Sequence, residues 1–236
     1  MKTKILAAGL AAFSLALSGC GNITPPVQNG QNSTAITESS SVTDSENSSE
    51  NESNIDEKKS AENAFVAEFF DADITFMDVE DLTAEPMKNS GFESEKNVTN
   101  GVQKFTLKSK NGGGELDVMR IDLVNANLSY STEKILENFS DYYFNFMLGN
   151  MQGVTESDVV SNTRNLSTLT DKGKFQRYIT VQKTDGMAAQ FGYAQTYAVL
   201  CENKLTVVSG AFLSADMMER QQFNSLVQRV TEKVQY

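Results

Sequence analysis

The pattern of hydrophobic and polar residues predicts several strands in the first part of the folding region. Residues 103–109 and 116–123 alternate between polar and apolar side chains, which is typical of β-strands with one buried face. The residues from Asn111 to Gly114 lie between these two strands and predict a flexible hairpin turn. An apolar-rich stretch at 74–79 predicts a short strand before them. We therefore expect this region to form antiparallel strands.

A second group of strands is predicted in the last third of the chain. Apolar, aromatic and β-branched residues recur in 175–184, 187–201 and 204–212. Asp185-Gly186 between the first two is a typical hairpin signal, and Glu202-Asn203 between the last two is short enough for a second tight turn. These strands are expected to form an antiparallel meander.

Three segments have apolar residues at helical spacing. Residues 61–70 predict a short helix with a phenylalanine face, and residues 131–151 predict a long helix with Ser131 as its N-cap. Ser214 is expected to cap a last helix. The apolar face of that helix consists of Phe223, Leu226, Val227, Val230 and Val234. Strands in two runs flanking helices predict an α+β fold in which helices pack on an antiparallel sheet.

A polar segment separates this folding region from the start of the chain. Residues 20–62 are rich in Ser, Asn, Thr, Glu and Gln and contain few apolar side chains. Such a segment buries too little apolar surface to offset the entropy lost on folding, so we expect a disordered linker. The expected organisation is therefore a leader at 1–19, a linker at 20–62 and a globular domain at 63–236.

The first residues have the pattern of a secretory signal peptide. Lys2 and Lys4 precede an apolar run at 5–17, which is too short to span a bilayer. The run ends in Leu17-Ser18-Gly19-Cys20, which resembles the lipobox of bacterial lipoproteins. That resemblance implies removal of residues 1–19 and a diacylglyceryl thioether on Cys20, whose fatty acyl chains include palmitate. It predicts a protein anchored by lipid to the cell membrane, on the extracytoplasmic face.

The amino-acid composition limits which partners this protein can bind and which roles its cysteines can have. The chain has 31 acidic and 20 basic residues, no histidine, and a net charge of -11. Nucleic-acid phosphates repel such a surface, so we expect no nucleic-acid partner and attachment to the membrane only through the covalent lipid. With Cys20 acylated, Cys201 has no cysteine to pair with. Cys201 lies in an apolar strand and is expected to be a small buried residue.

One sequence pattern offers a catalytic alternative. Ser131-Thr132-Glu133-Lys134 matches the Ser-x-x-Lys motif of serine acyltransferases that act on peptidoglycan or β-lactams. Lys183-Thr184-Asp185-Gly186 is close to the Lys-Thr-Gly element of the same enzymes, but Asp185 interrupts it. An N-cap role for Ser131 explains the first motif equally simply. The alternative function is a cell-wall serine acyltransferase or hydrolase that uses Ser131 and Lys134.

No cofactor or metal is predicted. Asp71, Asp73 and the acidic stretch 78–81 offer oxygen ligands of the kind that calcium prefers, but Leu82 stands where an EF-hand loop has its bidentate glutamate. A solvated acidic edge is the simpler interpretation. The absence of histidine excludes the mixed sites typical of zinc.

The order of elements in the second half resembles a known family. Tyr197-Ala198-Val199-Leu200, the Glu202-Asn203 turn, the strand 205–209 and a closing amphipathic helix are similar to the PsbP-like/DcrB-like domains of bacterial envelope lipoproteins. The resemblance extends over 74–236 and implies an α/β/α sandwich. It also implies a binding or accessory role without catalysis, so the expected function is that of a lipid-anchored binding lipoprotein whose partner is an envelope protein or ligand.

Overall fold

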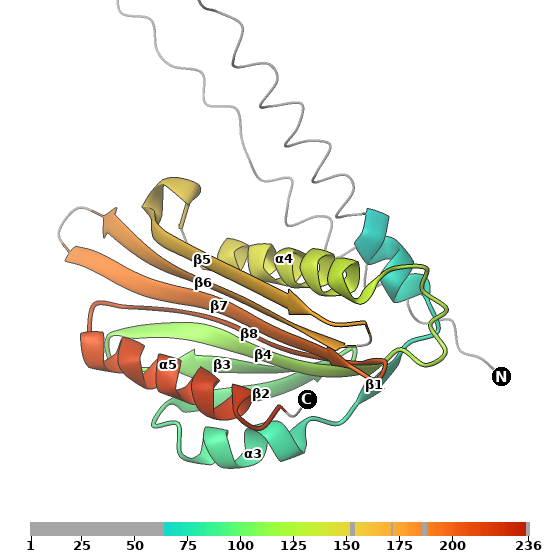
Figure 1. The fold of residues 1–236 in the computed structure, drawn as a ribbon. Coiled ribbons are helices and arrows are strands. Elements are labelled where there is room, and N and C mark those ends of the chain that lie inside the picture. Colours follow the sequence, from blue (N-terminus) through green and yellow to red (C-terminus); the bar gives the residue numbers. More distant parts are fainter. Residues whose placement is uncertain (1–63, 152–153, 171, 186–187, 235–236) are drawn as a thin grey trace, which may run out of the picture. The chain divides into compact units, whose positions relative to one another are not determined.

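An antiparallel sheet organises the folded part of this protein. The computed structural model describes residues 64–151, 154–170, 172–185 and 188–234. Within them the sheet has eight strands in the order β2-β3-β4-β8-β7-β6-β5, and β1 pairs with β4 beyond the end of β3 (Figure 1). The strands are β1 (Thr75–Met77), β2 (Glu93–Thr99), β3 (Val102–Lys108), β4 (Gly112–Asp122), β5 (Val159–Thr168), β6 (Lys172–Asp185), β7 (Ala188–Cys201) and β8 (Lys204–Ser214).

Helices pack on both faces of this sheet. Residues 64–71 form the first described helix. It is followed by α3 (Glu80–Lys88), α4 (Thr132–Asn150), the 3-10 turn η1 (Glu156–Asp158) and α5 (Met217–Thr231). The α+β fold with helices packed on an antiparallel sheet is therefore confirmed. The predicted leader at 1–19, the linker at 20–62 and Cys20 lie outside the described residues.

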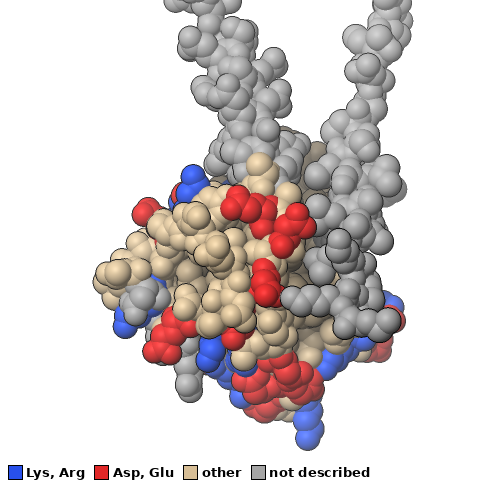
Figure 2. All heavy atoms as spheres, turned by 90° about the vertical axis from the view of Figure 1, so that its right-hand side faces the viewer, with Lys and Arg blue, Asp and Glu red and all other residues tan. Residues whose placement is uncertain are grey.

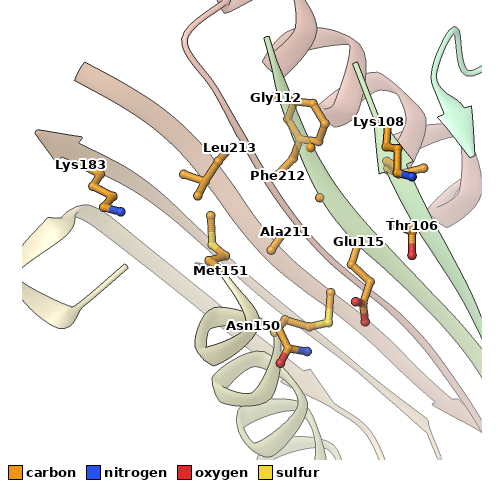
Figure 3. A pocket seen from close by; sticks show the side chains of 14 residues that line it. Thr106, Lys108, Gly112, Glu115, Asn150, Met151, Lys183, Ala211, Phe212 and Leu213 are labelled. Atoms are coloured by element: carbon orange, nitrogen blue, oxygen red, sulfur yellow. The ribbon is translucent and has the colours of Figure 1, made fainter. Parts of the chain in front are cut away.

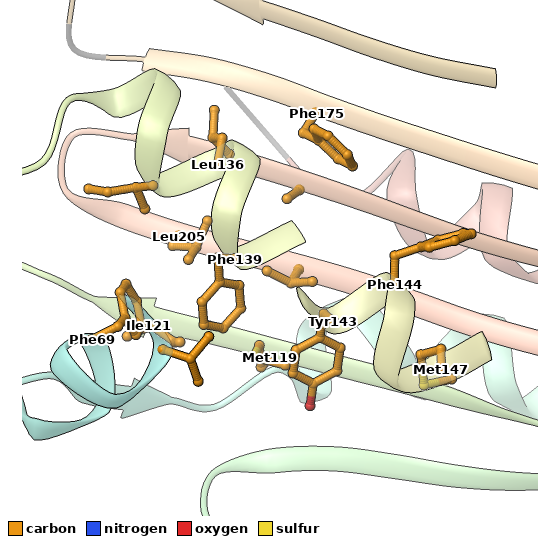
Figure 4. Close-up of a cluster of buried hydrophobic side chains, with 14 of the residues drawn as sticks. Phe69, Met119, Ile121, Leu136, Phe139, Tyr143, Phe144, Met147, Phe175 and Leu205 are labelled. Carbon is orange, nitrogen blue, oxygen red and sulfur yellow. The ribbon is translucent and has the colours of Figure 1, made fainter. Parts of the chain in front are cut away.

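Two hydrophobic cores hold the layers together. One lies between the sheet and the face of α4 and residues 64–71, with Phe139, Phe144 and Phe175 fully buried in it (Figure 4). The other joins the opposite face of the sheet to α3 and α5 and contains Phe212 and Phe223. Burying each such ring contributes about 1.5–3 kcal/mol. The strands of the middle of the sheet, buried on both faces, therefore carry apolar side chains in both directions.

The predicted pairings of the last three strands occur, and Gly186 of the expected Asp185-Gly186 turn lies outside the described residues. β6 pairs with β7 and β7 with β8 in continuous antiparallel register, and Glu202 and Asn203 have φ values of 49° and 62°, as a tight two-residue turn requires. The expectation that Asn111 to Gly114 form the turn was wrong. Gly112–Gly114 are already part of β4, because β8 lies alongside them and completes their backbone pairing.

Four elements were not predicted: β2, α3, η1 and β5. β2 is exposed along its whole length and has no apolar alternation, and β5 is similarly polar. The strand predicted at 74–79 is shorter in the structure, because β1 ends at Met77 and α3 begins at Glu80. Pro86 lies inside α3, where a proline normally argues against a helix.

The two long helices begin at capping side chains. The Lys134 N–H donates to Ser131 Oγ at 3.3 Å, which confirms Ser131 as the N-cap of α4. The sequence predicted Ser214 as the N-cap of α5, and this prediction was wrong. Asp216 is the cap, and its carboxylate accepts the N–H groups of Met218 and Glu219 at 2.7 and 3.4 Å.

Ion pairs fix α4 to the strands beneath it. The carboxylate of Asp141 on α4 accepts hydrogen bonds from Arg164 on β5 at 3.2 Å and from Arg177 on β6 at 3.1 Å. The Arg177 guanidinium also lies 4.1 Å from the centre of the Phe144 ring. These contacts hold α4 over β5 to β8 and leave β3 and part of β4 beyond its edge.

Candidate functional site

A groove lies at the edge of α4, where β3 and β4 emerge from beneath the helix. It encloses about 640 Å³. Asn150 and Met151 from the end of α4 line one side, and Thr106 and Glu115 from β3 and β4 line the other (Figure 3). Ala211 on β8 lies between Met151 and Glu115. The groove therefore has both apolar and polar walls, as ligand sites in proteins commonly do.

The glycine run Gly112–Gly114 shapes the end of this groove. Gly113 and Glu115 lie on the same face of β4, because side chains alternate along a strand. Gly113 has no side chain that would fill the groove. Gly114 faces the other way, and a Cβ there would lie 2.1 Å from the carbonyl oxygen of Ala211 on β8. One glycine thus keeps the groove open and the other allows two central strands to approach closely.

A chain of charged side chains leads from the groove into the core. Lys104 Nζ lies 2.6 Å from Glu115 Oε1, in the groove wall, and 3.6 Å from Asp117 Oδ2. The Asp117 side chain has no exposed surface, whereas Lys104 and Glu115 are each about a quarter exposed (28% and 27%). Lys104 also lies 5.4 Å from the centre of the Phe146 ring. Lys104 therefore connects a solvated carboxylate with a buried one.

Asp117 has an unusual environment for a carboxyl group. Burial, followed by the nearby charge of Glu115, raises the pKa of Asp117 to about 8, although Lys104 opposes this shift. The hydroxyl of Tyr143 lies 3.5 Å from Asp117 Oδ2, and burial holds the pKa of Tyr143 well above its usual value. Within the described residues, Asp117 Oδ1 has no hydrogen-bond partner. A buried oxygen without a hydrogen-bond partner normally lowers the stability of the folded state. We therefore consider Asp117 together with the nearby groove as a candidate functional site.

Lys104 keeps its charge in this cluster. Burial disfavours its charged form, but the carboxylates of Asp117 and Glu115 outweigh that effect and raise the pKa of Lys104. Glu115 lines the groove and Lys104 pairs with it, so a cation and an acceptor lie side by side next to the groove. This arrangement suits the binding of a polar group that both donates and accepts hydrogen bonds.

A second cavity lies at the opposite end of α4. It encloses about 480 Å³ and is lined by Leu128, Tyr130 and Ile135, with Glu202 at its border. Figure 2 views the domain from this end and shows uncharged side chains over much of it, with acidic groups gathered beside them. This cavity is smaller than the first, and none of its lining residues belongs to the Glu115–Lys104–Asp117 cluster, whereas Glu115 lines the first. The groove beside β3 and β4 is the stronger candidate.

The two motif-like segments behind the catalytic alternative lie near opposite ends of α4. Ser131 and Lys134 are both exposed on the first turn of α4, and the Ser131 hydroxyl accepts the cap hydrogen bond. Lys183 borders the groove with Asn150, at the other end of the helix. Because α4 has 19 residues, these two ends are about 28 Å apart. The two motif-like segments thus lie at separate places.

The acidic stretch at the start of α3 forms ion pairs. Asp78 accepts the N–H of Glu80 at 2.8 Å, and Asp81 pairs with Arg120 at 3.0 Å. Glu80 pairs with Lys96, and this hydrogen bond is the main reason that the pKa of Glu80 is lowered. Among the described residues, no group of three or more acidic or cysteine side chains is arranged to hold a metal ion.

Cys201 is less buried than the sequence predicted. It is partly exposed and has a free thiol, whereas its apolar neighbours in sequence predicted burial. Cys201 is the last residue of β7 and pairs with Lys172 and Lys204, so it lies at the edge of the core. Its position at a strand end explains the difference.

Comparison of the chain with protein-family models and with curated proteins finds no match. Within the described part of the chain, none of the helices has the length and apolar character needed to cross a membrane.

Proposed function

We propose that this protein is a lipid-anchored lipoprotein of the bacterial envelope with a binding or accessory role and no catalytic activity. In this proposal Cys20 carries the lipid, residues 20–62 form a tether, and the domain stands on the extracytoplasmic face of the cell membrane. Two or more acyl chains on one cysteine give a stable anchor. The lipobox sequence supports the anchor, and the net charge of -11 leaves little role for a basic membrane-binding patch.

We also propose that the domain is a PsbP-like/DcrB-like α/β/α sandwich. Helices on both faces of one antiparallel sheet support this assignment. So does the order of the last elements, where the β6–β7–β8 meander is followed by α5.

The groove beside β3 and β4 carries the proposed binding function. The single observation behind it is the chain from Glu115 through Lys104 to the buried, partly unpaired Asp117. A domain that only needed stability would gain by replacing such a cluster with packed apolar side chains. The proposed partner is an envelope protein or ligand with a polar group that Lys104 and Glu115 contact.

Site-specific photo-cross-linking in intact cells tests this use of the groove. A photoreactive phenylalanine analogue at Thr106, which is exposed in the groove wall, is expected to yield a discrete adduct. The matched control is the same analogue at Ser94 on β2, which is also exposed but faces the other side of the sheet. Mass spectrometry of the adduct would identify the partner. Equal labelling from both positions would contradict the proposal.

A further inference from the structure

A second surface of the domain has a composition that the rest of the chain does not share. Alternate residues of 161–167 on β5, 174–182 on β6 and 191–197 on β7 face away from α4, as the strand register requires. Among these described side chains none is acidic and only Lys174 is charged. The whole chain has 31 acidic residues. This surface, which we call the tyrosine face, is therefore depleted of charge.

Much of the tyrosine face is open to solvent. α5 packs on β8 and on the adjoining part of β7, on this side of the sheet. The side chains that β5 presents to this face are all exposed, and Gln176 on β6 is exposed as well. The described helices thus cover one edge of the face and leave the side chains of β5 and Gln176 exposed next to it.

Three partly exposed tyrosines lie across this area. The ring centres of Tyr178 and Tyr193 are 5.5 Å apart, and the planes are tilted by 32°. Tyr197 lies beside them on β7, with Lys174 Nζ 4.9 Å from its ring centre. Flat, partly exposed aromatic rings offer apolar contact area that loses little entropy on binding.

Hydrogen-bonding groups surround these rings. Asn224 on α5 donates to the Tyr178 hydroxyl at 3.5 Å and accepts from Gln195 at 3.2 Å. Burial raises the pKa of Tyr178 to about 12, so its hydroxyl stays protonated, and a hydrogen bond with Tyr193 adds to this shift. The exposed residues of β5 add Ser and Thr hydroxyls and an Asn amide.

We propose that the tyrosine face binds an uncharged polysaccharide chain. Sugar rings have apolar C–H faces that stack on aromatic rings, and their hydroxyl groups exchange hydrogen bonds with amides and hydroxyls. Nucleic acids also stack on aromatic rings, but they need a cationic groove for their phosphates, which this face lacks. With Lys174 as its single charged side chain, the face suits an uncharged ligand. The groove of the proposed function lies on the opposite side of the sheet, so the two sites are independent.

Tyrosine fluorescence of the full-length chain in detergent tests the proposal. The protein has 7 tyrosines and no tryptophan, so tyrosine emission is not masked. Titration with the uncharged hexasaccharides chitohexaose, cellohexaose and maltohexaose is expected to give saturable binding for at least one of them. Tyr178→Ala is expected to weaken that binding about tenfold. Gln176→Glu changes only an exposed side chain and is expected to weaken binding without affecting folding.

The control is Tyr130→Ala, which removes a partly exposed tyrosine on the α4 side of the domain and should leave binding unchanged. The proposal is overturned if none of the three sugars binds at millimolar concentration, or if Tyr130→Ala weakens binding as much as Tyr178→Ala. It is also overturned if sedimentation shows that the wild type self-associates and that Gln176→Glu abolishes this, because the face would then bind a second copy.

Discussion

Asp117→Asn is expected to remove most of the pH dependence of stability between pH 5.5 and 7.5. The buried carboxyl has a pKa of about 8 in the folded protein, compared with 3.8 for an exposed aspartate. Between these values the folded chain holds a proton that the unfolded chain has lost, so the free energy of unfolding falls as pH rises. The slope is about 1.4 kcal/mol per pH unit, which gives a loss of roughly 3 kcal/mol across this window.

Few other groups interfere with this measurement. The chain has no histidine, which would otherwise titrate in the same window. Asparagine has nearly the same shape as aspartate and stays neutral, so the Asp117→Asn variant should have a flat profile and exceed the wild type in stability at pH 7.5. Urea unfolding at several pH values measures this. Asp122→Asn, the same change at the less buried end of β4, is the control, and parallel profiles for wild type and Asp117→Asn would contradict the burial argument.

Gly114→Ala is expected to destabilise the domain by about 3 kcal/mol, near the upper end of the usual cost of overpacking. A Cβ at this position would lie 2.1 Å from the Ala211 carbonyl oxygen and 2.7 Å from Phe212 Cα. Both are backbone atoms of β8, in the centre of the sheet, and they cannot move without loosening the β4–β8 pairing.

The neighbouring glycine provides a matched comparison. A Cβ at Gly113 would meet only the Leu107 carbonyl oxygen, at 3.1 Å, and would point into the groove. Gly113→Ala should therefore cost much less than Gly114→Ala. Thermal and denaturant unfolding of the two variants tests the prediction, and equal losses of stability would show that close strand approach is not the reason for Gly114.

Regular apolar spacing made much of this fold predictable. α4, α5 and the strands β3, β4, β6, β7 and β8 each bury at least one face, and their patterns in the sequence reflect it. β2 could not be found in this way, because an exposed edge strand buries no face and needs no alternation. Pro86 argued against a helix at 80–88, so α3 was not predicted. The packing of α3 against α5 offsets the loss of helix stability that a proline causes.

The candidate site was harder to predict than the fold. The strand containing Asp117 was identified, and the alternation within it places Asp117 on the same face as Met119 and Ile121, both fully buried. An aspartate in line with two core residues was a usable signal of a buried carboxyl group. Its pairing with Lys104 depends on the β3–β4 register, and the groove depends on where α4 ends, so neither followed from local sequence.

The tyrosine face, like the groove, depends on helix packing that local sequence does not predict. Tyr178 lies in β6 and Tyr193 and Tyr197 lie in β7, both strands that were predicted. The last two are four residues apart, which predicts that they share one side of the strand. That α5 would cover β8 and leave β5 and β6 open is a property of the helix packing, which the strand pattern does not contain.

Mass spectrometry of the mature N-terminus from native cells tests the central claim, attachment of this protein outside the cytosol by lipid on one cysteine. The account predicts that the chain begins at Cys20 with diacylglycerol on the sulfur. It also predicts that Cys20→Ser abolishes incorporation of tagged palmitate and releases the protein from the membrane fraction. A mature chain that begins elsewhere, or an unmodified Cys20 in membrane-bound protein, would contradict it.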